Sequence, residues 1–276
     1  MGPMGAKNKG TARRALVPAF IFILFVAALL YILLPVASVF LKISPEGAAA
    51  SLGNPMVIDA LRLSLYTTLI SSVIVVIAGT PIAYVNARYA YRGKELVDTI
   101  VDLPVVMPPA VAGLALLMAF GRRGVLGQYF DLLGVSIAFS TAAVIMAQVF
   151  VASPFYIRQA RTSFEDVDRS YENAARTLGA SPLRTFFYVT VPIAMNGLVS
   201  GAILSWARAL GEFGATIMFA GNFQGRTQTM PLAIYTAMQS DLDSSLLLSI
   251  ILVIISFTVI AAVKMLTRRG LILAKD

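Results

Sequence analysis

Long apolar runs separated by short polar segments extend along most of the chain. A helix that crosses a lipid bilayer needs about 20 predominantly apolar residues. The charge-poor runs and their flanks predict six such helices, at about residues 16–41, 62–87, 96–120, 135–157, 191–220 and 244–266. The pattern therefore predicts an all-α, polytopic membrane protein with one transmembrane domain over residues 1–276.

The first apolar run follows a basic flank, as the core of a secretory signal peptide does. It is longer than the roughly 7–15 residues of such a core, and no convincing cleavage site follows it. We expect this segment to remain in the protein as its first membrane span.

Composition supports the membrane assignment and removes several kinds of chemistry. Of the 276 residues, 58% are hydrophobic and 13% are charged, against about 25% charged in soluble domains. The chain contains no histidine and no cysteine, so it offers no zinc site of the usual ligands, no cysteine nucleophile and no Ser-His-Asp triad. We expect no metal, no cofactor and no catalytic residue in this chain.

The net charge of +8 is distributed unevenly between the predicted loops. With the N-terminus inside, most lysines and arginines fall in cytoplasmic segments, and the outer segments hold few: Lys42, Arg62, Arg122, Arg123 and Arg226. The positive-inside rule then predicts a multi-pass protein of the cell (inner or plasma) membrane with both termini in the cytoplasm. Topology explains the basic charge, and nucleic-acid binding is not required.

The connection between the fourth and fifth predicted spans, residues 168–190, resembles a piece of soluble protein. Asp168 can cap the N-terminus of a helix. One helical face then repeats at intervals of three and four residues, at Tyr171, Ala174, Ala175 and Leu178. Glu172 and Arg176 are spaced to form an i, i+4 ion pair on another face.

A turn and a second helix follow. Gly179 stands where a left-handed residue ends a helix, and Ser181-Pro182 provides an N-cap followed by proline at the first helical position. The small residues of the first helix would let another protein approach its backbone closely. Packing of this helix on its own chain is an alternative that the pattern fits equally well.

The stretch "ENAARTLGASPLRTFFYVTVPIA" resembles the EAA signature of ABC-importer permeases. Glu172, Gly179 and Pro192 keep the spacing of that signature, although Asn173 is inserted after the glutamate position and Val191 replaces the usual leucine. The resemblance implies a type I importer permease whose coupling helix docks in a cytoplasmic ATPase subunit. The implied coupling residues are Tyr171, Glu172, Ala174, Ala175, Arg176, Leu178, Gly179, Ala180, Ser181 and Pro182.

Two further stretches resemble the oxyanion branch of these permeases: "DLPVVMPPAVAGLALLMAFGRRGVLG" and "SWARALGEFGATIMFAGN". The Gly121–Gly124 turn and "TMPLAIYTAMQ" are closer to the molybdate/tungstate members, with sulfate or thiosulfate as the alternative substrate. Candidate contacts with an extracytoplasmic oxyanion-binding protein are Arg122, Arg123, Met230, Pro231 and Tyr235. Attraction of the oxyanion by Arg122 and Arg123, or a purely structural role of both at the end of a turn, are the alternatives, and the structural role is the simplest.

A tetrahedral dianion needs a lined pathway, because crossing hydrocarbon would cost a large desolvation free energy. Prolines in the third span and an ion pair in the fifth mark a candidate pathway or gate, formed by Pro104, Met107, Pro108, Pro109, Arg208, Glu212, Phe213 and Gly214. A static kink and a structural ion pair are the alternatives. Gly197 and Gly201 form a close-contact pattern that could serve dimer packing, packing within the chain or the pathway.

No Gly-x-x-x-x-Gly-Lys-Ser/Thr phosphate-binding loop occurs in the sequence. An ATP-driven mechanism would therefore place ATP and Mg²⁺ on a separate subunit. The resemblance implies two copies of this permease, most simply a homodimer, with two ABC ATPase subunits and a binding protein that delivers molybdate or tungstate.

Two other classes of protein, a secondary transporter and a membrane-embedded enzyme, fit the sequence less well. An ion-coupled secondary transporter would show inverted repeats with matching broken helices, and we find no convincing repeat. A membrane-embedded enzyme could use the carboxylates of Asp98 and Asp102, but acidic residues are ordinary near the start of a helix.

Overall fold

The computed structural model describes residues 8–273, which form helices joined by short loops without a β-strand in that range. Five long helices contain apolar stretches sufficient to span a bilayer: α1 (Asn8–Lys42), α3 (Pro55–Arg88), α7 (Thr141–Glu165), α10 (Val191–Leu210) and α13 (Leu242–Leu273). A bent pair, α4 (Lys94–Val106) and α5 (Pro109–Phe120), is long and apolar enough when taken together, which gives six spans if the pair is counted as one. Each of the six predicted spans thus corresponds to a helix or to a helix pair.

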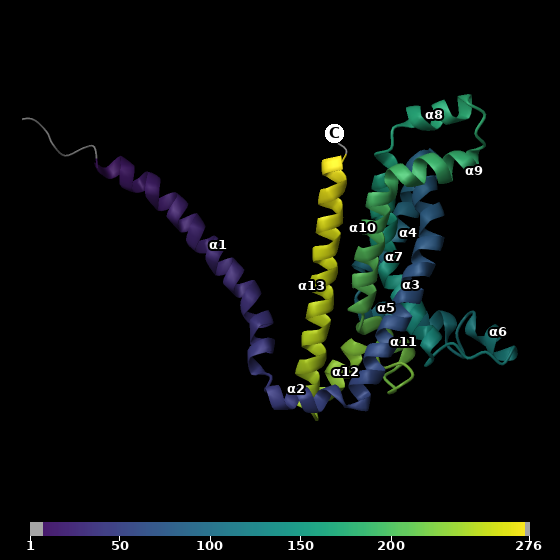
Figure 1. The fold of residues 1–276 in the computed structure, drawn as a ribbon. Coiled ribbons are helices and arrows are strands. Elements are labelled where there is room, and N and C mark those ends of the chain that lie inside the picture. Colours follow the sequence, from purple (N-terminus) through teal and green to yellow (C-terminus); the bar gives the residue numbers. More distant parts are fainter. Residues whose placement is uncertain (1–7, 274–276) are drawn as a thin grey trace, which may run out of the picture.

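Short helices lie at the two ends of the bundle: α2 (Pro45–Leu52), α6 (Gly127–Leu132), α8 (Arg169–Thr177), α9 (Pro182–Thr185), the π-helix η1 (Phe186–Thr190), α11 (Gly214–Ala220) and α12 (Met230–Ala237). Figure 1 shows α8 and α9 at the same end as the C-terminal end of α13, with α2, α6 and α12 at the opposite end. The first helix, α1, leans away from the other spans and joins them through α2 (Figure 1).

The central helix of the bundle is α7, which packs against both α3 and α10. Its Tyr156 and Phe164 are buried in a cluster with Val75 and Leu198. A buried polar chain adds to this contact, because Ser71 donates a hydrogen bond to Gln148 (2.9 Å), whose amide donates to Thr67 (3.1 Å). Such pairing satisfies polar groups that would be costly to leave open at membrane depth.

Close backbone approach between α7 and α10 depends on Gly197. A Cβ at this position would lie 2.6 Å from Cβ of Ser163, closer than side-chain carbons approach one another. The Gly197 and Gly201 pattern therefore serves packing within the chain.

We expect Gly197→Ala to destabilise the protein by about 1–3 kcal/mol, the usual cost of overpacking. Gly211→Ala is the matched control, because its nearest neighbour to a new Cβ is 3.9 Å away. Thermal unfolding of the purified protein measures the difference. The double change Gly197→Ala/Ser163→Gly should recover most of the loss, and no recovery would contradict this contact.

Two ion pairs fix α4 against α7 near the end that carries α8. Asp98 lies 2.7 Å from Arg161, and Asp102 lies 2.5 Å from Arg158. The i, i+4 carboxylates singled out in the sequence are thus matched by two arginines three residues apart on the neighbouring helix.

The third predicted span differs from a continuous helix over 96–120. Helices α4 and α5 meet at an angle of 115° around Met107 and Pro108. Met107 is extended (φ −67°, ψ 134°), as the residue before a proline prefers, and the adjacent prolines supply no N–H to continue the helix. The fifth predicted span is interrupted as well, because α10 ends at Leu210 and α11 begins at Gly214.

Candidate functional site

The predicted helix, turn and second helix in residues 168–190 are confirmed. Asp168 caps α8 by accepting a hydrogen bond from the Ser170 amide (2.8 Å), which lowers the pKa of its carboxyl group. Gly179 adopts a left-handed conformation (φ +85°) that side chains disfavour. Ser181 caps α9 by accepting from the Arg184 amide (3.3 Å). Each of these features depends on neighbours in the sequence, so local patterns sufficed to predict them.

A buried ion pair holds α8 on the bundle. The Glu172 side chain is only 7% exposed and lies 3.0 Å from Nη2 of Arg88, at the end of α3. Thr190 donates a second hydrogen bond to the same carboxylate oxygen (2.7 Å), and Arg88 donates to the carbonyl of Val167 (2.9 Å). Glu172 therefore joins α3, α8 and the start of α10.

This geometry corrects the expectation that Glu172 pairs with Arg176. The Glu172 face of α8 lies over the end of α3, so the carboxylate meets Arg88 instead, and Arg176 remains exposed. The sequence contained no signal for this pairing, because Arg88 belongs to a different predicted span.

The turn that leads into α10 is unusual. In η1 the Val191 amide donates to the carbonyl of Phe186, five residues earlier. The hydrogen-bonded turn therefore contains one residue more than a turn of an α-helix. Phe186 packs edge-on against Tyr84 of α3 with ring centres 4.8 Å apart. Together with Thr190, which reaches Glu172, this turn connects α8 to the fifth span.

Four large apolar or aromatic side chains are exposed along α8, α9 and η1. Leu178 is 89% exposed, and Tyr171, Leu183 and Tyr188 are also exposed on this segment. We call these four residues the docking face. Figure 1 shows α8 beyond the ends of the spans and α9 about level with the C-terminal end of α13. Large apolar side chains exposed together on one short segment are typical of a contact with another protein or with a membrane.

The interruptions of the third and fifth spans meet in the folded chain. A Cβ at Gly214 would lie 2.4 Å from Cβ of Pro109, and one at Gly113 would lie 2.6 Å from the carbonyl oxygen of Ala215. The start of α5 therefore contacts the start of α11 without intervening side chains. Of the other candidate pathway residues, Pro104 is buried, Met107 and Phe213 are partly buried, and Pro108 is exposed.

The predicted ion pair between Arg208 and Glu212 is confirmed. Nη1 of Arg208 lies 2.7 Å from Oε2 of Glu212, and the other oxygen of Glu212 accepts a hydrogen bond from the Ala215 amide (2.8 Å). Glu212 is 2% exposed and Arg208 is 30% exposed at the side chain. One carboxylate thus caps α11 and neutralises the arginine in the last turn of α10.

We expect Arg208→Met to destabilise the protein by about 3 kcal/mol, because Glu212 would stay buried without its counter-charge. The double change Arg208→Met/Glu212→Gln removes the charge and keeps the oxygen that caps α11, so it should recover most of the stability. Chemical unfolding in detergent compares the variants. Equal stability of Arg208→Met and the wild type would contradict a structural role for the pair.

At the other end of the bundle, the candidate contacts for a binding protein fall into two groups. Arg122 pairs with Asp131 (3.2 Å) in a largely exposed position, and Arg123 and Tyr235 are exposed too. Pro231 is partly buried. Met230, by contrast, is fully buried in the core, so it packs inside the protein and offers no outer surface.

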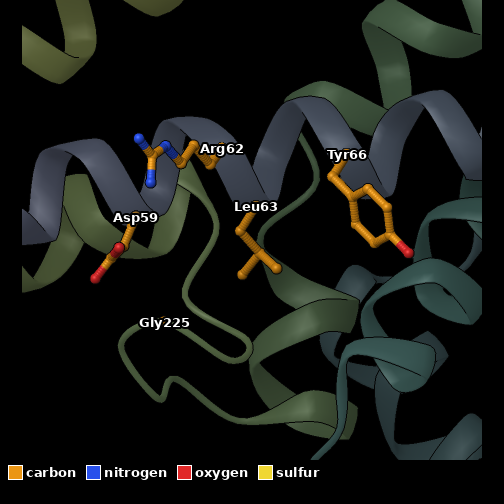
Figure 2. Close-up of a pocket in the computed structure, with 5 residues that line it drawn as sticks. All are labelled: Asp59, Arg62, Leu63, Tyr66 and Gly225. Carbon is orange, nitrogen blue, oxygen red and sulfur yellow. The ribbon is translucent and has the colours of Figure 1, made fainter.

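A pocket of about 390 Å³ at this end was not indicated by sequence reasoning. It is lined by Asp59, Arg62, Leu63, Tyr66 and Gly225. Figure 2 shows Asp59 and Leu63 pointing from α3 toward the loop that carries Gly225. The loop returns beneath α3 through left-handed Gly221 and Gly225 (φ +73° and +71°), so distant residues form the pocket.

Acidic groups do not assemble into a metal site within residues 8–273, since no cluster of three or more His, Cys, Asp or Glu side chains occurs there. The arrangement provides instead a docking face at one end, two interrupted helices in contact and an exposed charged surface at the other end.

Comparison with known proteins gives a consistent family. Residues 77–270 match the model of the family described as binding-protein-dependent transport system inner membrane component. The molybdenum transport system permease protein ModB of Mycobacterium tuberculosis is 39% identical over 246 residues, which cover 89% of this chain and 93% of the relative. The molybdate/tungstate transport system permease protein WtpB of Pyrococcus abyssi is 40% identical over 194 residues, 70% of this chain and 73% of the relative.

The fold also matches solved structures. A chain of a bacterial ABC transporter that imports the acidic polysaccharide alginate superposes with a TM-score of 0.74 over 95% of this chain and 98% of that one, at 14% identity. This likeness confirms the predicted all-helical fold.

Proposed function

The chain belongs to the family of binding-protein-dependent transport system inner membrane components, and from this premise we propose that it is the permease subunit of an ATP-driven importer of molybdate or tungstate. The names of the relatives ModB and WtpB, molybdenum and molybdate/tungstate transport permeases, support this substrate class. The observation that carries the proposal is the docking face on α8 and α9, anchored from behind by Glu172.

The partner at the docking face is a cytoplasmic ABC ATPase, which supplies the ATP and Mg²⁺ chemistry that this chain lacks. An exposed leucine beside exposed aromatic residues is the composition of an interface anchor, and Gly179 lets the segment turn sharply without bulk. Two such ATPases would serve two copies of the permease, with the N- and C-termini of each permease in the cytoplasm.

The contacts of Glu172 provide a route for coupling. Movement of α8 would be transmitted to the start of α10 through Thr190, and along α10 to the ion pair of Arg208 and Glu212. Glu212 caps α11, which packs on the start of α5. A shift of α8 would therefore reach both interrupted helices, where broken backbone can line a pathway for an ion.

A second copy of this chain would complete the pathway. Asn196 is exposed on α10 in the middle of an apolar span, and Arg208 remains partly exposed toward the end of the same helix. Polar groups at membrane depth usually face a protein neighbour or a water-filled cavity. These side chains support a permease homodimer with α10 at or near the pathway.

The exposed end that carries Arg122 and Arg123 is the proposed contact for the oxyanion-binding protein. It lies at the end of the bundle opposite α8 (Figure 1). The oxyanion would thus be delivered at one end of the bundle and released at the other.

Uptake into proteoliposomes tests the proposal. The permease, its ATPase and its binding protein are reconstituted together, and molybdate and tungstate uptake is measured with ATP enclosed and with a non-hydrolysable analogue. We expect uptake only with ATP and the binding protein. Uptake driven by an ion gradient without ATP would establish a secondary transporter, and uptake of sulfate alone would overturn the substrate assignment.

A further inference from the structure

A basic pocket lies behind the docking face, between the end of α3 and α8. It has a volume of about 270 Å³. Its lining includes the arginines Arg88, Arg169 and Arg176, together with Glu172 and Asn173. At roughly 30 Å³ per water molecule, this space holds a small ion with part of its hydration shell.

The pocket has more positive than negative charge. Its one carboxylate, Glu172, is already engaged by Arg88 and Thr190. Arg169 uses one nitrogen to donate to the carbonyl of Arg88 (2.9 Å). Within the described part of the chain, Arg176 makes no ion pair.

The guanidinium of Arg88 is incompletely satisfied. Its Nη2 donates to Val167 and pairs with Glu172, whereas its Nε is buried and has no hydrogen-bond partner in the structure. Buried donors in proteins nearly always have a partner, so this nitrogen needs an explanation, and an unplaced water or ion is one of those known.

We propose that this pocket binds a small tetrahedral oxyanion from the cytoplasm and thereby regulates the movement of α8. Planar guanidinium groups donate paired hydrogen bonds to oxyanions, and the side chains of Arg169 and Arg176 are available beside Arg88. Two sources share this chemistry: inorganic phosphate, and the transported molybdate or tungstate after release, the second of which rests on the proposed function.

The position of the pocket gives the direction of the effect. Arg169 and Arg176 belong to α8 and Arg88 belongs to α3, so a bound oxyanion bridges the two helices. The bridge holds α8 in the position seen in this structure, and any movement of α8 that ATP drives must then break it. By linkage, occupancy of the pocket lowers ATP-driven transport, and the ATP-driven conformer in turn binds the oxyanion more weakly.

Direct binding and anomalous scattering test the inference. The purified permease–ATPase complex in nanodiscs is titrated with tungstate and with phosphate by calorimetry, and the tungsten position is located from its anomalous signal. Arg176→Gln and Arg169→Gln should each weaken binding by about tenfold, the loss expected for one charge-assisted hydrogen bond. Arg184→Gln is the matched control, since Arg184 is exposed on neighbouring α9 and does not line the pocket.

The outcomes separate the sources and the alternatives. Tungsten density between α3 and α8, with weaker binding in both pocket variants and unchanged binding in Arg184→Gln, supports the inference. Competition by phosphate at its cytoplasmic concentration identifies phosphate as the ligand there. Equal tungstate and phosphate binding in all variants overturns the site.

Loss of ATPase association in Arg176→Gln, without ion binding to the wild type, would show that the pocket receives an acidic side chain of the ATPase, and it would overturn the ion site. Wild-type uptake is measured separately. Phosphate binding in a complex that transports no molybdate would refute the proposed function alone, whereas transport without ion binding would refute the pocket alone.

Discussion

Leu178→Asp is expected to abolish ATP-driven uptake and to release the ATPase from the permease. Leu178 is 89% exposed in the isolated chain, so the change should leave the fold of the permease intact. Truncating a hot-spot residue at the centre of an interface costs about 2 kcal/mol or more, and a carboxylate placed there would also be desolvated. We expect the affinity for the ATPase to fall by at least about thirtyfold, measured by co-purification and by biolayer interferometry in nanodiscs.

Leu132→Asp is the control for this experiment. Leu132 is 84% exposed at the end of α6, on the side of the bundle opposite α8. ATPase affinity should be unchanged in this variant. Unchanged ATPase affinity in Leu178→Asp as well would refute the docking face, provided that thermal unfolding shows both variants to be folded.

Glu172→Ala is expected to be the most destabilising single change in the α8 region. It would leave Arg88 buried without its counter-charge and would remove the acceptor for Thr190. Removing one partner of a buried ion pair typically costs about 3–5 kcal/mol. We expect α8 to detach from α3, with a matching fall in the free energy of unfolding and faster proteolysis between α7 and α9.

Two further variants test whether the burial of the ion pair is the reason why Glu172→Ala loses stability. Arg88→Met/Glu172→Met removes both charges and should recover stability, although not coupling. Glu165→Ala breaks a comparable pair with Arg161 (2.9 Å) that is partly exposed, and exposed pairs contribute about 0–1 kcal/mol. If Glu172→Ala is no more destabilising than Glu165→Ala, the buried pair does not anchor α8.

Glu172 and Glu165 show which contacts could be predicted from the sequence and which could not. Caps, turns and the face of α8 were predictable because each depends on residues within a few positions, as with Asp168 and Gly179. The spans were predictable because hydrocarbon selects for length and apolar composition. The partner of Glu172 was not, because α3 and α8 come together only when the whole bundle packs.

The sequence predicted that the third span is bent, but it did not predict the angle of the bend. The prolines near Met107 indicated a bend, but the angle of 115° depends on how α5 packs against α11. Likewise, Arg208 and Glu212 were expected to pair because they are four residues apart. The second contact of Glu212, to the Ala215 amide, arises because the helix is interrupted between α10 and α11. The continuous apolar run in the sequence does not reveal this interruption.

The widened turn η1 makes the length of this segment as important as its chemistry. Losing one residue between Phe186 and Thr190 would restore ordinary α-helical spacing and rotate everything before it by about 100° relative to α10. Thr190 would then turn away from Glu172, and α8 would take a different direction relative to α10. Substitutions of the exposed Phe187 and Tyr188 keep the number of residues in this turn. A one-residue deletion is instead expected to change the direction of α8 relative to α10, even when every contact residue is retained.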